Sequence, residues 1–520
     1  MEQTSKRTPT VLLILDGWGI APPSESNPIT ASALPNFDAL FKNALNTRLS
    51  AHGQYVGLPK DQDGNSEAGH LNLGAGRLVK QDGVLISESI QDGTFFKNPA
   101  FMEAIQHAKR NNSSVHLMGL LSDGQSAHSR SEHLEALLDL MHKEKVTSVF
   151  VHLFTDGRDS LPQSGQGLYR ELAESLHPNQ RVATIMGRFY GMDRKKTWTR
   201  TKLAYDALVS GRGIAIQDPL EAFEQSYRAG LSDEYIKPHV IGENGVPIGP
   251  IKDNDSVILF NHRSDRARQL AKVFVQKNFE RDNRGSFNPE PRPKKLRFVA
   301  MSDFGPDLGD IITAYPSKDL EETLPMALNG MRQLYIAETE KYAHITYFFN
   351  GGYADPVAGE DRIMVPSPDV RTYDESPGMA TKGIADEIIK AVSLGTHDFI
   401  AANIACLDMV AHTGNFAAAQ AALAVADQEI GRIVQAVAEK GGTLAVTADH
   451  GNIEEMKDLS SGSADTEHSK NQVPFIISSP SLAGSTLRQD GILGDVAPTI
   501  LAQLGIATPK QMTGTSLFLR

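Results

Sequence analysis

The stretch that decides the fold reads Leu444-Ala445-Val446-Thr447-Ala448-Asp449-His450-Gly451-Asn452. A short apolar run that closes on glycine predicts a buried strand ending at a turn. In open α/β sheets, ligands bind outside the carboxyl ends of the strands, and here an acid and an imidazole stand at that end. Both side chains are good ligands for a divalent metal of intermediate softness. An Asp-His-Gly turn is also common on protein surfaces, so other segments decide between the two interpretations.

The same pattern recurs along the chain. The continuous apolar run Val11–Leu15 stops at Asp16-Gly17, which predicts a central parallel strand with a carboxylate at its end. Further strands are predicted at Val115–Leu121, Val149–Phe154, Val182–Met186, Val257–Phe260 and Leu296–Met301, and amphipathic helices at Ile29–Phe41, Glu132–Lys143 and Arg200–Ser210. This alternation predicts α/β architecture with mostly parallel sheets.

The length of 520 residues exceeds the usual reach of one hydrophobic core, so we expect more than one domain. Two turns marked by glycine or proline, near 74–83 and 314–316, are the expected boundaries. The candidate metal ligands lie before the first boundary and after the second, whereas the arginine-rich motifs lie between them. We therefore expect a metal domain formed by 1–80 and 314–520, with a substrate-binding domain, 81–313, inserted into it.

Composition narrows the class of protein. A hydrophobic content of 40% and a charged content of 22% are typical of a globular enzyme. The formal net charge of -12 argues against a nucleic-acid partner, because phosphate backbones require a basic footprint. It does not exclude a small anionic substrate, because local arginines and metals can create a positive pocket within an acidic protein.

Cysteine usage and hydropathy bear on location. The single cysteine, Cys406, lies in the apolar run Phe399–Leu407, which predicts a buried, inert thiol and a reducing compartment. No apolar run approaches the length of a membrane span, and Met1–Arg7 lacks the apolar core of a signal peptide. We expect a cytoplasmic protein that is a monomer and has no membrane partner.

Possible metal ligands occur in four segments. They are Asp16 after the first strand, Asp408 and His412 at i and i+4, Asp449 and His450 after the late strand, and His468 in a polar loop. Carboxylate oxygen mixed with imidazole nitrogen suits a two-metal site, and favours Mn²⁺ or Zn²⁺ over Ca²⁺ or Mg²⁺. Singly, Asp408 could cap a helix and His468 could be a solvated loop residue. Their joint occurrence favours the metal interpretation.

A possible nucleophile occurs in Asp63-Gly64-Asn65-Ser66-Glu67-Ala68-Gly69-His70. Ser66 precedes a helical stretch, so it stands near a helix N-terminus. One interpretation is that Ser66 only caps the helix, a role that serine fills readily. The other is that backbone N–H groups favour an incoming phosphate there and a coordinated metal activates the hydroxyl. The residues alone leave both open.

Arginines follow three of the middle strands. The motifs are Phe154–Asp159, Gly187–Arg194 and Phe260–Arg266, and His128 follows a fourth strand end at Leu120–Gly124. The planar fork of arginine binds carboxylate and phosphate bidentately, so arginines at several strand ends predict a small, doubly anionic substrate. Ordinary Arg–Asp pairing at the surface explains one such motif, but three in one segment favour a binding site.

With these residues in place, the chain resembles the cofactor-independent (2,3-bisphosphoglycerate-independent) phosphoglycerate mutases of the alkaline phosphatase superfamily, nearly end to end. The matching stretches are Leu15–Gly19, Gly64–His70, Asp156–Asp159, Ala337–His344 and Thr447–Asn452. Each is modestly specific, and the ordered set is very specific. The resemblance implies an alkaline-phosphatase-like domain with a phosphotransferase domain inserted into it.

The resemblance also implies an activity. Ser66 would take the phosphoryl group of 3-phosphoglycerate and return it to the 2-hydroxyl of the retained glycerate, giving 2-phosphoglycerate in glycolysis and gluconeogenesis without bisphosphoglycerate. Two divalent ions, with Mn²⁺ expected, would be held by Asp16, Ser66, Asp449 and His450 at one site and by Asp408, His412 and His468 at the other. The glycerate would contact His128, Arg158, Asp159, Arg188, Arg194, Arg263, Arg266 and Lys341. Catalytic roles are implied for Ser66, Lys341 and Asp159, with Lys341 bridging the domains.

One stretch departs from the family. The segment after Ser122-Asp123-Gly124 usually reads Gly-Val-His-Ser-His, whereas Gln125–Arg130 is one residue longer and has Arg130 in place of the second histidine. Two rival functions stay open. Another enzyme of the superfamily, such as a phosphomonoesterase, phosphopentomutase or nucleotide phosphodiesterase, would share the metal ligands, and a plain phosphatase would not need the arginines. A non-catalytic metal- or phosphosugar-binding protein would not need Ser66.

Overall fold

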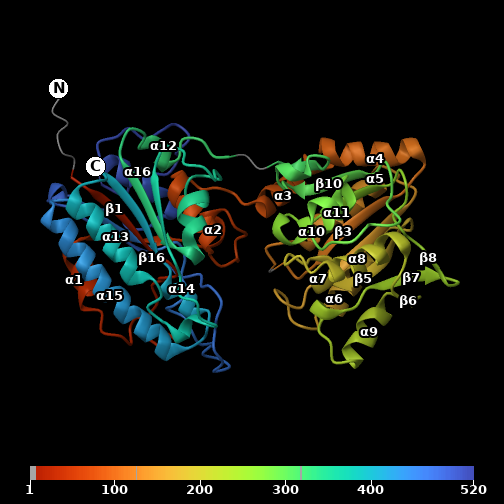
Figure 1. Cartoon of the computed structure of the whole chain (residues 1–520), viewed down its shortest axis with the longest axis horizontal. Helices are drawn as coiled ribbons and strands as arrows, with labels where there is room; N and C mark the ends of the chain where they lie inside the picture. Colours follow the sequence, from red (N-terminus) through yellow and green to blue (C-terminus); the bar gives the residue numbers. More distant parts are fainter. Residues whose placement is uncertain (1–7, 125, 317–318, 520) are drawn as a thin grey trace. The chain divides into compact units, whose positions relative to one another are not determined.

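The computed structural model describes residues 8–124, 126–316 and 319–519. The chain divides into two compact units, Met1–Gln81 with Lys318–Arg520 and Asp82–Ser317. In Figure 1 the first unit combines the red start of the chain with its cyan and blue end, and the second unit runs from orange to green. These divisions fall at 81/82 and 317/318, against the 80/81 and 313/314 expected above. The later second boundary reflects β11 (Ile312–Tyr315), which belongs to the sheet of the second unit.

The described part of the first unit contains an eight-stranded sheet in the order β13-β12-β14-β1-β15-β16-β2-β17. Its strands are β1 (Thr10–Leu15), β2 (Leu45–Ser50), β12 (Gln333–Glu338), β13 (Asp361–Val365), β14 (Phe399–Ile404), β15 (Thr443–Thr447), β16 (Val473–Ser478) and β17 (Gly491–Ile492). β1 pairs in parallel with β14 and β15, and Leu13 lies opposite Ala402 and Val446. Every residue of β1 is buried, because a central parallel strand is covered on both faces, and this is why its sequence is continuously apolar.

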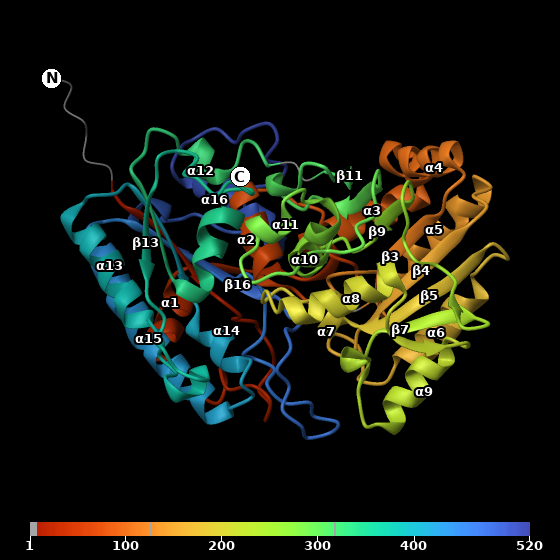
Figure 2. The ribbon, with the colours of Figure 1, turned by 45° about the vertical axis from the view of Figure 1, so that its right-hand side comes forward.

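Helices cover both faces of this sheet. They are α1 (Pro35–Asn43), α2 (Ser66–Ala75), α12 (Leu324–Ala327), α13 (Thr381–Leu394), α14 (Cys406–Ala411), α15 (Phe416–Glu439) and α16 (Val496–Gln503). Figure 2 shows α13 and α15 side by side along one face, and α2 and α16 contact each other elsewhere in the unit. None of the helices in the described part of the chain has the length and apolarity needed to cross a membrane.

One expected helix is shorter than predicted. The sequence indicates a helix over 29–41, but α1 begins only at Pro35. Proline fits the first turn of a helix and lacks the N–H that an interior position needs, so it marks the start. The preceding residues form turns in which the side chain of Asn27 accepts from the Thr30 N–H and donates to the Ala21 carbonyl.

The second unit contains a nine-stranded sheet in the order β11-β10-β9-β3-β4-β5-β7-β6, with β8 paired to β7. The other strands are β3 (Val115–Leu121), β4 (Val149–Thr155), β5 (Gln180–Gly187), β6 (Ile214–Ile216), β7 (His239–Glu243), β8 (Val246–Pro247), β9 (Ser256–Leu259) and β10 (Arg297–Ser302). The helices are α3 (Asp82–Gln91), α4 (Pro99–Asn111), α5 (Ser131–Lys143), α6 (Gly165–Glu174), α7 (Arg188–Gly191), α8 (Trp198–Ser210), α9 (Leu220–Arg228), α10 (Ser264–Val275) and α11 (Phe279–Asp282).

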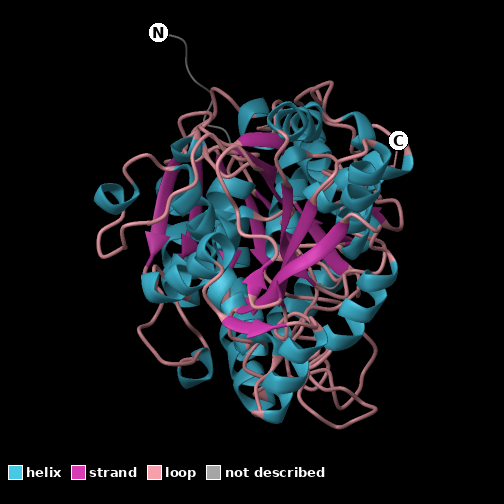
Figure 3. Ribbon diagram, turned by 90° about the vertical axis from the view of Figure 1, so that its right-hand side faces the viewer, coloured by secondary structure: helices cyan, strands magenta, loops and turns pink. Residues whose placement is uncertain are grey.

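Both faces of this second sheet are also buried. Along β3, Leu117 and Leu121 pack into one apolar core, and Met118 and Leu120 pack into another. Figure 3 shows the strands in magenta with helices in cyan around them. The predicted α/β class with mostly parallel sheets is confirmed in both units.

Candidate functional site

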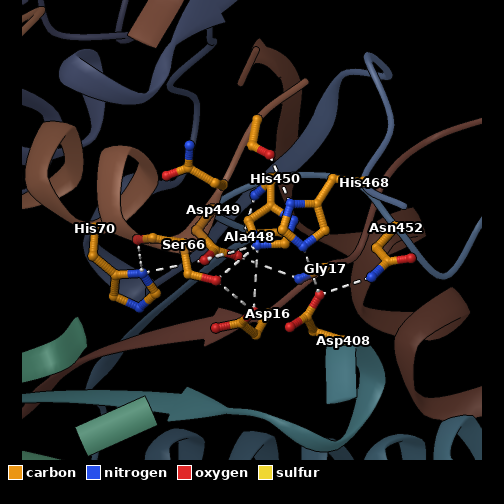
Figure 4. Close-up of polar contacts among 12 residues, drawn as sticks. Asp16, Gly17, Ser66, His70, Asp408, Ala448, Asp449, His450, Asn452 and His468 are labelled. Carbon is orange, nitrogen blue, oxygen red and sulfur yellow. Dashed lines mark hydrogen bonds and ion pairs between the residues drawn. The ribbon is translucent and has the colours of Figure 1, made fainter. Parts of the chain in front are cut away.

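Four adjacent parallel strands of the first unit end at the same edge of its sheet. These strands are β12, β14, β1 and β15, and each is followed within a few residues by a charged side chain. The charged residues are Lys341 after β12, Asp408 after β14, Asp16 after β1, and Asp449 with His450 after β15. Because the carboxyl ends of parallel strands meet at one edge, residues far apart in sequence converge there (Figure 4).

The first group of possible metal ligands is Asp408, His412 and His468. The Nε2 atoms of His412 and His468 lie 3.3 and 3.4 Å from Asp408 Oδ1, and 3.1 Å from each other. Each ring turns its Nδ1 to a backbone carbonyl, that of Thr466 at 2.7 Å and that of Gly64 at 2.8 Å. A donor hydrogen on each Nδ1 leaves the Nε2 lone pair pointing toward Asp408, which is the arrangement that metal-binding histidines need. These residues fit a divalent ion.

The second group surrounds Ser66. His450 Nε2 lies 2.9 Å from Ser66 Oγ, and Ser66 Oγ is 3.3 Å from Asp16 Oδ1. The neighbouring Asp449 is fully buried, yet its Oδ2 accepts no hydrogen bond of good geometry from the described residues, although His70 Nδ1 lies 3.2 Å away. A buried carboxylate oxygen left in this state is costly unless a cation compensates it. The second group therefore also fits a divalent ion.

The local structure of α2 frees the hydroxyl of Ser66. The N-cap is Asn65, whose side chain accepts from the Ala68 N–H at 2.9 Å, and Ser66 is the first residue of the helix. Of the two interpretations of Ser66, the cap is therefore wrong. Helix α2 can lie close to the backbone of Asp449 because residue 69 is glycine. A Cβ atom at this position would stand 2.5 Å from the carbonyl oxygen of Asp449.

Lys341 lies between the two groups. Its Nζ donates to Asp16 Oδ1 at 2.6 Å, to Asp408 Oδ2 at 2.7 Å and to Ser66 Oγ at 2.7 Å. Burial alone would lower its pKa, but the carboxylates of Asp16, Asp408 and Asp449 raise the pKa of Lys341 overall. These contacts all belong to the first unit, and the expected bridging of the two domains stays a prediction.

The pKa values of two carboxylates in this centre shift in opposite directions. Burial and the charge of Asp449 raise the pKa of Asp16 to about 6. Burial also disfavours the charged form of Asp449, but His450 and His70 outweigh it and hold its pKa below the ordinary value. Burial lowers the pKa of His450 to about 3, so this imidazole is neutral near pH 7.

The arginines of the second unit also follow adjacent strand ends. β9, β3, β4 and β5 are neighbours and parallel. Arg188 is 3% exposed, and its Nη1 donates to Asp156 Oδ1 at 2.5 Å and to Asp159 Oδ2 at 2.7 Å. Arg158 Nη2 donates to Glu234 at 2.5 Å. Each guanidinium is therefore anchored by a carboxylate from another segment.

The remaining predicted substrate residues lie around Asp265. Arg194 Nη1 donates to Asp265 Oδ2 at 2.6 Å, while Arg263 Nε and His128 Nδ1 lie 3.2 and 3.7 Å from Asp265 Oδ1. Burial lowers the pKa of His128 to about 4, so its ring is neutral. Burial and the charges of Arg194, Arg188 and Arg158 lower the pKa of Arg266, which places Arg266 within a positive cluster. In the unusual segment before α5, Gln125 lies outside the described residues.

Comparison with known proteins identifies the family of this chain. The model of the Metalloenzyme superfamily matches residues 8–508. A 2,3-bisphosphoglycerate-independent phosphoglycerate mutase of Moorella thermoacetica is 45% identical over 516 residues, which cover 98% of each chain. That of Clostridium perfringens (strain SM101) is 44% identical over 515 residues, 98% of this chain and 99% of the other. The chain belongs to the 2,3-bisphosphoglycerate-independent phosphoglycerate mutases.

A solved structure of a phosphoglycerate mutase supports the same assignment. The Leishmania mexicana phosphoglycerate mutase, crystallised at low cobalt concentration, superposes with a TM-score of 0.77 at 28% identity, covering 100% of this chain and 99% of that one. Family membership and the convergent ligand groups together make this chain a metalloenzyme with sites for divalent ions.

Sequence reasoning missed several residues of this mutase centre. His70 forms a third possible ligand group with Asp16 and Asp449, and it lies one helical turn after Ser66, a spacing that puts both on one face of α2. Asn452, in the turn after β15, donates to Asp408 Oδ1 at 2.8 Å. Asn403 donates to Asp16 Oδ2 at 2.6 Å from within a buried strand.

Proposed function

We propose that this chain interconverts 3-phosphoglycerate and 2-phosphoglycerate through a phosphoserine at Ser66, without 2,3-bisphosphoglycerate. The observation that carries the proposal is the position of Ser66 Oγ. It is within hydrogen-bond distance of His450 Nε2, Asp16 Oδ1 and Lys341 Nζ, at the junction of the two ligand groups. Phosphoryl transfer depends chiefly on positioning and on charge stabilisation, and this constellation can supply both.

The proposed reaction uses the chain's own residues in two steps. Ser66 Oγ loses its proton and bonds to phosphorus while the bond from phosphorus to the C3 oxygen breaks, and that oxygen takes up a proton to become the 3-hydroxyl of glycerate. The 2-hydroxyl of the retained glycerate then loses its proton and bonds to phosphorus while the bond from Ser66 Oγ to phosphorus breaks, and Ser66 regains a proton. Lys341 Nζ, 2.7 Å from Ser66 Oγ, would neutralise charge on the moving group. Divalent ions bound by Asp16, Ser66, Asp449 and His450 and by Asp408, His412 and His468 would lower the pKa of the serine hydroxyl and stabilise the phosphoryl oxygens.

The second unit supports the part of the proposal that concerns glycerate. We assign the binding of the carboxylate and hydroxyl groups of glycerate to His128 and to the arginines of this unit, which are Arg158, Arg188, Arg194, Arg263 and Arg266. We assign a catalytic role to Asp159, whose Oδ2 accepts a hydrogen bond from Arg188. This role belongs to the inserted domain, which the sequence places at 81–313 within a metal domain made of 1–80 and 314–520. Holding glycerate in place would separate a mutase from a phosphatase, because the intermediate is returned instead of being hydrolysed.

Metal identity and state of the protein are part of the same proposal. The mixture of carboxylate and imidazole donors suits Mn²⁺ or Zn²⁺, and the resemblance to the family favours Mn²⁺ as the resident metal. The single, buried Cys406 supports a reducing, cytoplasmic location. We propose that the active form is a monomer, because the ligands of both groups come from one chain.

The test is a coupled assay for 2-phosphoglycerate formed from 3-phosphoglycerate, run without bisphosphoglycerate and with or without a chelator. We expect chelator-sensitive activity in the wild type and a loss of about 10⁴-fold or more in Ser66→Ala. Ser460→Ala, at an exposed serine of the same unit, is the matched control and should keep full activity. Release of free phosphate without 2-phosphoglycerate, or wild-type turnover in Ser66→Ala, would contradict the proposal.

A further inference from the structure

His70 and Asn403 form a buried connection between two carboxylates of the metal centre. Both residues are 0% exposed. His70 Nδ1 lies 2.9 Å from the carbonyl oxygen of Ser66 and 3.2 Å from Asp449 Oδ2. Its Nε2 lies 3.0 Å from Asn403 Nδ2, which also donates to Asp16 Oδ2 at 2.6 Å. Figure 4 shows His70 beside Ser66.

These contacts settle the hydrogen positions of the connection. A carbonyl oxygen can only accept, so the hydrogen of His70 is on Nδ1, and Nε2 must accept. Asn403 Nδ2 has two hydrogens, and it gives one to His70 and the other to Asp16. Asn403 therefore donates to both Asp16 and His70. His70 in turn donates from Nδ1 to the carbonyl oxygen of Ser66, with Asp449 Oδ2 close by.

The same argument separates His70 from the histidines that can bind metal. His412 and His468 also give Nδ1 to a carbonyl, but their Nε2 atoms face Asp408 Oδ1. In His70 both ring nitrogens are already engaged, one by a carbonyl and one by an amide. His70 is therefore not a ligand, although it lies close enough to Asp16 and Asp449 to form a group with them.

The connection determines where the carboxylates point. Asn403 lies opposite Ile14 in the pairing of β14 with β1, so its amide is fixed by two central strands. Its hold on Asp16 Oδ2 leaves Oδ1 facing Ser66 Oγ and Lys341 Nζ. His70 places a donor beside Oδ2 of Asp449. The other carboxylate oxygen of Asp449, Oδ1, already accepts from the backbone N–H groups of Gly17 and His450.

We propose that His70 and Asn403 are positioning residues that orient Asp16 and Asp449 for the metal ion beside Ser66. The inference rests on the proposed two-metal centre. Residues that orient metal ligands in this way are worth about 10- to 100-fold in metal affinity. Among the described residues, neither His70 nor Asn403 contacts Asp408, His412 or His468, so the affinity of the ion held by these three should change less.

The experiment is calorimetric titration of the metal-free protein with Mn²⁺, which reads affinity and stoichiometry without any assay of activity. A His412→Ala background removes a ligand of the first group alone, so the remaining ion reports on the second group. In that background we expect Asn403→Leu to weaken Mn²⁺ binding about 10- to 100-fold. Asn350→Leu is the matched control, because Asn350 is another buried asparagine of the same unit and donates to a carboxylate, Glu360.

Variants of His70 test the direction of donation and guard against misfolding. His70→Asn can place an amide donor near the position of Nδ1, whereas His70→Gln cannot, so His70→Asn should bind Mn²⁺ more tightly than His70→Gln. Circular dichroism and urea unfolding of the metal-free variants check that each is folded. Equal loss in both His70 variants would mean that His70 is itself a ligand and would overturn the inference.

Two outcomes separate this inference from the proposed function. If the wild type binds two ions and Asn403→Leu binds Mn²⁺ as tightly as its parent, the positioning role is wrong and the two-metal centre stands. If the wild type binds a single ion, the two-metal centre is wrong and the inference falls with it.

Discussion

The two units collect charge in opposite ways. At the centre of the first unit three buried carboxylates, those of Asp16, Asp408 and Asp449, face one ammonium group, that of Lys341. In the second unit each anchored arginine has its own acidic partner. The pairs are Arg158 with Glu234, Arg188 with Asp156 and Asp159, and Arg194 with Asp265.

This difference indicates what each site needs from its ligand. The first site has an excess of negative charge that cations can complete, so metal binding adds interactions that the protein does not make by itself. The second site has already neutralised much of its positive charge, so an anion must compete with built-in carboxylates. If the proposed substrate binds there, we expect the site to select a small, doubly charged anion, because a singly charged anion gains little free energy when it displaces a carboxylate from an arginine.

Among the changes that test the comparison of the two units, the largest effect is expected from removing a carboxylate of the first site. Asp408→Asn should lower kcat/KM by about 10³-fold or more and remove one bound ion, because Asp408 faces both His412 and His468. Steady-state assays and metal analysis of the purified protein measure both effects. Asp427→Asn is the matched control. This buried carboxylate of the same unit accepts from the Phe37 N–H at the start of α1, and its loss should lower stability without changing metal content.

A smaller effect is expected in the second site. Arg188→Lys should lower kcat/KM by about 10²-fold, mainly through KM, and leave both metal ions bound, because a lysine cannot keep two planar hydrogen bonds and still bind an anion. Arg181→Lys, at a half-exposed arginine of β5, the strand that precedes Arg188, should behave as the wild type. A loss of metal from Arg188→Lys would contradict the expectation that metal binding in the first unit is independent of the arginines in the second unit.

The smallest effect concerns stability and pH in the second unit. A chain of buried hydrogen bonds runs across three neighbouring strands from Thr184 through His152 to His116, and it ends at Asp255, the residue before β9. Burial holds the pKa of His152 well below its ordinary value of 6.5. Below pH 6.5 the unfolded chain binds a proton at this histidine and the folded chain does not, so stability falls as the pH falls.

We expect His152→Gln to reduce that dependence by up to about 1.4 kcal/mol per pH unit. Urea unfolding at several pH values between 5 and 7.5, with hydrogen exchange to locate the effect in the second unit, makes the measurement. His177→Gln, at a more exposed histidine of the same unit, should leave the dependence unchanged. Equal pH dependence in the wild type and His152→Gln would contradict the prediction.

The features that the sequence predicted best are the apolar strands and the polar residues that follow them. Central parallel strands must be apolar throughout, so β1 and β15 and the polar residues after them stand out without any structure. The residues before Pro35 have the apolar spacing of a helix, so the sequence predicted one there. In the structure they form turns, one of them held by the side chain of Asn27. Asn403 could have been suspected as a polar residue in the apolar run of β14. Its partners, however, come from the turn after β1 and from α2, and only the fold brings these segments together.

Gly69 limits how this chain can vary over generations. Any side chain at this position would meet the carbonyl of Asp449 and push α2 away from the turn after β15, and Ser66 would move with the helix. The loss would not depend on the size or polarity of the new residue, since a methyl group is already too large. A substitution of Gly69 is therefore not neutral. It can persist only if a second substitution in the turn after β15 makes room for the new side chain.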